Sequence, residues 1–156
     1  MKNLDTKLIE PILEKHQVVL AYLFGSAARG TMGMHSDIDI GVVFDDRMIP
    51  REKQFDEKLA IASEIEQKFK VRNADVINLN QQKNPVLRYE IVLEGKPIFA
   101  KDYSAQARLT RSVLREYEDT KYLRETAYQI LREQIRSGQF GRVSVASIPE
   151  NHYVTS

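Results

Sequence analysis

The sequence predicts an α/β fold of the α+β type, in which a small mixed β-sheet carries helices against one face. Three short runs rich in β-branched and aromatic residues are typical of buried strands, and they occupy residues 18–25, 37–44 and 74–79. Apolar residues recur at helical spacing in two further segments, 5–16 and 50–69. Strands and helices that alternate in this way form a sheet whose apolar face is covered by the helices.

The second of these strands has two chemically different faces. Side chains of a strand point alternately to opposite sides of the sheet. Ile38, Ile40 and Val42 therefore share one face, and Asp37 and Asp39 share the other. We expect helices to cover the apolar face and the carboxylates to lie on the opposite, open face.

The segment after the third strand is expected to complete the sheet. Pro85 is suited to begin a helix that continues to Leu93, and Gly95 is suited to end it. Residues 97–100 are then expected to add a short edge strand.

The C-terminal region reads as helix, because residues 103–136 contain neither proline nor glycine. This pattern predicts one long helix, or two helices that break near Asp119 and Thr120. We therefore divide the chain into a core, a helical extension suited to partner binding and a polar tail, which are residues 1–102, 103–138 and 139–156.

The composition narrows the classes of protein to which the chain can belong. The net charge is +1 and no block of like charge occurs, so nothing indicates binding to a long nucleic acid. There is no cysteine, which excludes disulfides and thiolate metal sites. No apolar run approaches the ~20 residues that a membrane-spanning helix needs, and the N-terminus has no apolar signal segment. We therefore expect no membrane association and a cytoplasmic location.

The candidate catalytic residues are three aspartates. Asp37 and Asp39 lie two positions apart on one strand, which puts their Cα atoms about 6.6 Å apart on one face. Two carboxylates in this arrangement can hold Mg²⁺ together with phosphate oxygens and water. Asp75, at the start of the next strand, is the candidate third ligand, and it could also accept or orient the proton of an attacking hydroxyl. The alternative for Asp75 is an ordinary turn residue.

A candidate phosphate site directly follows the first strand. Gly25 would let the backbone approach a phosphate closely, and the Ser26 hydroxyl could donate a hydrogen bond to it. Arg29 could reach the same phosphates with a charge-assisted hydrogen bond. Gly25 and Ser26 alone would also fit an ordinary turn, so the interpretation depends on their combination with the aspartate pair.

Together these residues resemble the minimal nucleotidyltransferase (MNT) family, a branch of the polymerase-β-like superfamily. The family's pattern is Gly-Ser, then about ten residues, then Asp-X-Asp. The matching segments of this chain are FGS at 24–26, ARG at 28–30 and SDIDI at 36–40, and the resemblance covers roughly residues 18–100. Ala27 departs from the pattern, because many members carry a basic residue there.

The resemblance implies a nucleotidyltransferase fold that uses ATP and one or two Mg²⁺ ions. The implied metal ligands and catalytic residues are Asp37, Asp39 and Asp75. The implied nucleotide-binding residues are Gly25, Ser26, Arg29 and Ser36. For Ser36 the alternative is that it simply ends the turn before the strand.

A chain in which a helical extension follows such a core resembles the antitoxins of HEPN–MNT toxin–antitoxin pairs. This similarity implies that AMP is transferred from ATP to a hydroxyl group of a HEPN ribonuclease toxin, namely that of a tyrosine. It also implies a hetero-oligomer with that toxin. Two alternatives remain open: a nucleotidyltransferase that modifies a small molecule such as an aminoglycoside, and a non-catalytic antitoxin that neutralises its partner by binding. For the helical extension, the alternative to partner binding is a solvated face with local ion pairs.

Overall fold

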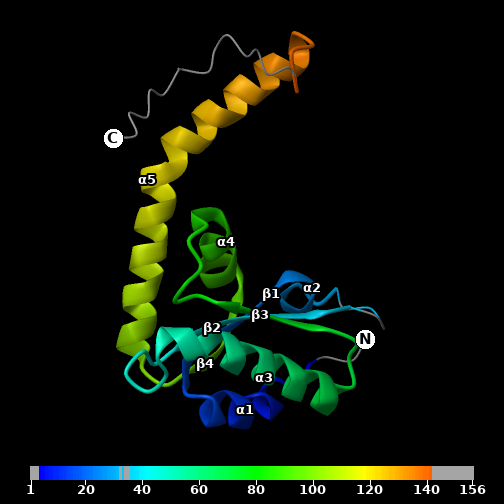
Figure 1. Ribbon diagram of the computed structural model, residues 1–156, viewed down its shortest axis with the longest axis vertical. Coiled ribbons are helices and arrows are strands. Elements are labelled where there is room, and N and C mark those ends of the chain that lie inside the picture. The colour runs from blue at the N-terminus through cyan, green and yellow to red at the C-terminus, as the bar shows by residue number, and fades with distance from the viewer. Residues whose placement is uncertain (1–3, 32, 34–35, 142–156) are drawn as a thin grey trace, which may run out of the picture. The chain divides into compact units, whose positions relative to one another are not determined.

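The computed structural model describes residues 4–31, 33 and 36–141 of the chain (Figure 1). Contacts divide the chain into two compact units, Met1–Asp119 and Thr120–Ser156. Within the described residues, no helix is both long enough and apolar enough to cross a membrane.

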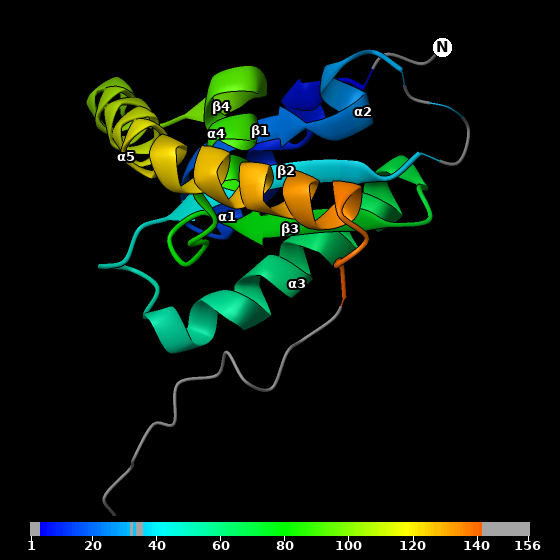
Figure 2. The same ribbon diagram turned by 90° about the horizontal axis from the view of Figure 1, so that it is seen from above.

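The first unit contains a mixed sheet of four strands in the order β3-β2-β1-β4. The strands are β1 (Val18–Phe24), β2 (Ile38–Phe44), β3 (Ala74–Asn78) and β4 (Lys96–Ala100). β1 is antiparallel to both β2 and β4, whereas β2 and β3 are parallel. Figure 2 shows this order from above. The sheet confirms the predicted mixed architecture and all of the predicted strands.

Two helices cover the first face of the sheet: α1 (Glu10–Lys15) and α3 (Arg51–Phe69) (Figure 1). The predicted N-terminal helix is divided, because a short 3₁₀ turn, η1 (Thr6–Leu8), precedes α1. Ile61 and Ile65 of α3 are fully buried against Ile38 and Ile40 of β2 in one apolar core. This is the apolar face that the alternation in residues 37–44 predicts.

A buried histidine joins the two helices of this face. His16 Nδ1 lies 2.5 Å from Oε2 of Glu57, and Nε2 lies 2.7 Å from Oε1 of Glu64. Lys15 Nζ donates to the same Glu64 oxygen at 2.8 Å. Because both glutamates belong to α3 and His16 follows α1, these hydrogen bonds fix the helices to one another.

The second face of the sheet, which the sequence predicts to be open, is partly covered by a helix as well. The predicted helix 85–93 is divided into α4 (Pro85–Tyr89) and a π-helix, η2 (Glu90–Glu94), and η2 packs over part of this face. Gly41 of β2 permits that approach, since a Cβ atom there would lie 2.5 Å from Cγ2 of Ile91. Apolar residues that the sheet presents on this side require such a cover.

The last helix, α5 (Tyr103–Arg136), is continuous and crosses the boundary between the two units. Its first part belongs to the sheet unit: Val113 is fully buried, Glu116 accepts a hydrogen bond of 3.1 Å from Arg88, and Tyr117 stacks on Tyr89. The boundary between the units thus falls after Asp119, and residues 103–119 of the expected extension pack with the core.

Candidate active site

The three predicted aspartates lie at one end of the second face. Asp39 and Asp75 are direct register partners across the parallel strands β2 and β3. Neighbouring strands lie about 4.8 Å apart, and paired residues point to the same side. Asp37 precedes β2 by one residue and shares the face of Asp39 by alternation. Asp37 and Asp75 are exposed, and Asp39 is half-buried.

This arrangement exposes the Asp39 carboxyl to the negative charges of Asp37 and Asp75. Burial is the largest cause that raises the pKa of the Asp39 carboxyl, and repulsion from Asp75 and Asp37 raises it further. Arg29 opposes the shift, because its positive charge favours the ionised carboxylate. A cation at this end of the sheet would relieve the repulsion among the three carboxylates.

Gly25 lies directly against Asp39. It begins the short helix α2 (Gly25–Ala28), and its φ of +67° lies in the left-handed region that favours glycine. A Cβ atom there would lie only 2.4 Å from Oδ2 of Asp39. The preceding residue, Phe24, is the register partner of Asp39 across β1 and β2. The end of β1 and the candidate catalytic carboxylate are therefore in immediate contact.

The other predicted nucleotide-binding residues differ in their burial and in their hydrogen bonds. Ser26 is half-buried in α2, and its carbonyl oxygen accepts a 3.0 Å hydrogen bond from the Thr31 amide. Arg29 is exposed at the end of α2 and close enough to act on the charge of Asp39. The Ser36 hydroxyl accepts a 2.7 Å hydrogen bond from the Gly33 amide, which is the turn-ending role considered for it from the sequence.

A pocket of about 80 Å³ beside Gly25 adds residues to which no sequence pattern points. Arg29 lines it together with Glu90 and Glu94 of η2. The charge of Glu90 also contributes to the raised pKa of Asp39. The sequence contains no signal for Glu90, because it lies within an ordinary amphipathic pattern and only the packing of η2 brings it to the aspartates.

The donor set fits Mg²⁺ by its chemistry, because hard cations of this kind prefer carboxylate oxygens together with phosphate and water. Among the described residues, however, no three acidic or histidine side chains lie close enough together in this structure to hold a metal ion. After burial, repulsion from Asp75 and Asp37 contributes to the raised pKa of Asp39, and a bound cation would offset that repulsion.

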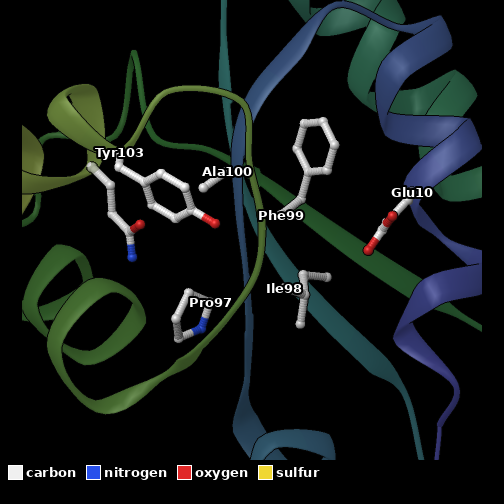
Figure 3. Close-up of a pocket in the computed structure, with 7 residues that line it drawn as sticks. Glu10, Pro97, Ile98, Phe99, Ala100 and Tyr103 are labelled. Atoms are coloured by element: carbon white, nitrogen blue, oxygen red, sulfur yellow. The ribbon is translucent and has the colours of Figure 1, made fainter.

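A wider pocket, of about 410 Å³, lies along the outer strand β4 and shares no lining residue with the acidic end. In Figure 3, Tyr103 lies on one side of the strand, while Phe99 and Glu10 lie on the other. Pro97 in this strand removes a backbone donor, and a bulge interrupts its pairing with β1. Both features protect a sheet edge against pairing with further strands.

Comparison with known proteins places this geometry in a family. A profile described as Polymerase beta, Nucleotidyltransferase matches residues 7–104, which is more than half of the chain. A search of curated proteins finds no match.

Solved structures share the fold. A chain from the crystal structure of a toxin–antitoxin complex with AMP-PNP has a TM-score of 0.70 and 21% identity, covering 83% of this chain and 99% of that chain. A chain from an MntA–HpeT toxin–antitoxin mutant with two aspartates replaced by glutamate has a TM-score of 0.70 and 20% identity, covering 83% and 99%. A chain from the complex of a tri-AMPylated Shewanella oneidensis HEPN toxin with an MNT antitoxin has a TM-score of 0.64 and 19% identity, covering 85% and 99%.

Proposed function

The chain belongs to the polymerase beta nucleotidyltransferase family, and on this basis we propose that it transfers AMP from ATP to a tyrosine hydroxyl of a HEPN-type ribonuclease toxin and so acts as its antitoxin. The observation that carries the proposal is the pairing of Asp39 with Asp75 beside Gly25. This arrangement puts two carboxylates and a close backbone approach at one point, as phosphoryl transfer requires.

The structural neighbours support the choice of substrate and partner. One was solved with AMP-PNP, an ATP analogue, and another contains a HEPN toxin that carries AMP groups. In the MntA–HpeT mutant the two replaced aspartates are two positions apart, which is also the spacing of Asp37 and Asp39. Because the reaction consumes ATP, we expect it to take place in the cytoplasm.

Asp37, Asp39 and Asp75 would hold one or two Mg²⁺ ions. When bound, Mg²⁺ would neutralise charge on the α-phosphate and on the leaving pyrophosphate. Gly25 and Ser26 would bring backbone and hydroxyl donors to the phosphates, and Arg29 would add a charge-assisted hydrogen bond. Ser36 would contribute by holding the turn that leads into β2.

The proposed reaction is an in-line displacement at the α-phosphorus. The acceptor oxygen forms a bond to that phosphorus while the bond to the oxygen bridging to the β-phosphate breaks, and pyrophosphate leaves. The hydroxyl proton passes to Asp75, which is exposed and therefore accessible to an acceptor from outside.

The second unit supplies a surface suited to a partner protein. In the part of α5 that follows Asp119, five large apolar or aromatic side chains are between 55% and 75% exposed: Tyr122, Leu123, Tyr128, Ile130 and Ile135. Leu123 and Ile130 are seven positions apart and so lie on one face of the helix. Exposed apolar side chains in this density are typical of an interaction site, and we assign this surface to the toxin in a hetero-oligomer.

Mass spectrometry of the partner tests the proposal. The purified protein is incubated with ATP, Mg²⁺ and the product of the neighbouring gene, tested as the HEPN-type partner, and the mass of that intact partner is then measured. We expect the partner's mass to increase by one or more AMP moieties, on a tyrosine. A stable complex with an unmodified partner would instead favour neutralisation by binding alone.

A further inference from the structure

The pocket beside Gly25 carries opposite charges on its walls. Arg29 lines it from the end of α2, and Glu90 and Glu94 line it from η2. Among the described residues, neither Arg29 nor Glu90 makes a side-chain hydrogen bond or ion pair. Glu90 is half-buried. A half-buried carboxylate without a partner retains its full capacity to accept hydrogen bonds from a ligand.

Tight packing fixes the backbone that carries Glu90. Gly95 directly follows η2, and a Cβ atom there would lie 2.2 Å from the carbonyl oxygen of Ile91 and 3.0 Å from that of Leu23. The π-helix is therefore pressed against β1 close to the point where β1 reaches Gly25. Ile91, the neighbour of Glu90, is fully buried. Single π-helical turns of this kind occur frequently at functional sites.

The oppositely charged walls of the pocket favour two different kinds of ligand group. Arg29 attracts phosphate oxygens, whereas the carboxylates of Glu90 and Glu94 repel them. A carboxylate next to a phosphate site is well suited to accept a hydrogen bond from a hydroxyl group. Both reactants of the proposed reaction carry such groups, the ribose of ATP and the acceptor.

We propose that Glu90 positions a reactant by accepting a hydrogen bond from one of its hydroxyl groups while a phosphate lies against Arg29. This inference rests on the proposed nucleotidyltransferase function and deepens it. The hydroxyl comes either from the ribose of the nucleotide or from the acceptor side chain, and the two sources are separated by experiment.

The test combines nucleotide binding with transfer kinetics for the wild type and Glu90→Gln. Titration calorimetry measures the affinity for ATP, 2′-deoxy-ATP and 3′-deoxy-ATP in the presence of Mg²⁺. If the ribose is the ligand, Glu90→Gln weakens ATP binding about 10-fold, because a neutral amide oxygen accepts a weaker hydrogen bond than a carboxylate. The substitution then has little effect on the affinity for the deoxy analogue that lacks the bound hydroxyl. If the acceptor is the ligand, nucleotide affinity is unchanged and the KM for the HEPN-type partner rises by a similar factor.

Glu14→Gln is the matched control, because Glu14 is exposed on α1, on the opposite face of the sheet, and the substitution removes the same charge. It should change none of these values. Unchanged ATP affinity and unchanged KM for the partner in Glu90→Gln, with an active wild type, would overturn the role of Glu90 alone. A wild type that neither binds ATP nor modifies the partner would overturn the proposed function as well.

Discussion

A Cβ atom on Gly25 would lie 2.4 Å from Oδ2 of Asp39. Ordinary contacts between non-bonded atoms are about 3.5–4.0 Å, so any other residue at position 25 would displace this carboxylate. The positive φ of Gly25 disfavours other residues for a second, independent reason. The turn at the end of β1 and the position of the candidate catalytic group are thus determined together.

Replacement of Gly25 by alanine should therefore reduce AMP transfer by about 100-fold, the scale of loss that follows a misplacement of about 1 Å. It should also cost about 1–2 kcal/mol of stability, because alanine is strained at this φ. Initial rates with the HEPN-type partner and the unfolding free energy in urea measure the two effects.

Gly30→Ala separates the two causes. Gly30 has a φ of +68°, almost the same as Gly25, but a Cβ atom there would meet nothing within 4 Å. This variant should lose a similar amount of stability and keep its activity. Equal activity losses in both variants would show that backbone strain, and not contact with Asp39, is responsible.

The raised pKa of Asp39 gives a prediction for stability without divalent metal. A raised pKa in the folded state means that ionisation of this carboxyl opposes folding, so stability is lost as the pH rises above the ordinary value of 3.8. Asp39→Asn removes that ionisation and should be more stable than the wild type at pH 7. The difference should shrink as the pH is lowered toward 4, and thermal unfolding in EDTA measures it.

Addition of Mg²⁺ should stabilise the wild type and leave Asp39→Asn nearly unchanged, because a ligand stabilises the state that binds it. Equal stabilisation of both proteins would show that Mg²⁺ binds at a site that does not include Asp39.

Glu64 should show the opposite dependence on pH. Hydrogen bonds from Lys15, and then from His16, lower its pKa below the ordinary value of 4.5, so its contribution is present at neutral pH and is lost as the pH falls through its pKa in the folded state. Glu64→Gln should therefore be less stable than the wild type at pH 7, and the difference should diminish in acid. Transfer activity should not change, because α1 and α3 cover the face opposite to the aspartates.

The sequence predicts the strands and the aspartate pair because both depend on local patterns. Alternation alone puts Asp37 and Asp39 on one face. The pairing of Asp39 with Asp75 is different, since register between strands that are distant in the chain is decided by tertiary packing. The same holds for Glu90, which reaches the site only because η2 packs on the second face.

The helix surface of the second unit can be tested apart from catalysis. Leu123→Asp combined with Ile130→Asp should weaken binding to the HEPN-type partner at least about 10-fold, because charged groups would replace apolar contacts at the interface. Affinity for ATP should be retained. Glu125→Gln, an exposed polar change on the same helix, should affect neither value, and surface plasmon resonance measures the partner affinity.

The most direct test of the account is transfer of label from ATP carrying ³²P in the α-phosphate to the HEPN-type partner. We expect labelled partner with the wild type, no detectable label with Asp39→Asn, and a rate reduced by about 10²–10⁴ with Asp75→Asn. Undiminished labelling by Asp39→Asn, or an unlabelled but neutralised partner with the wild type, would contradict the account.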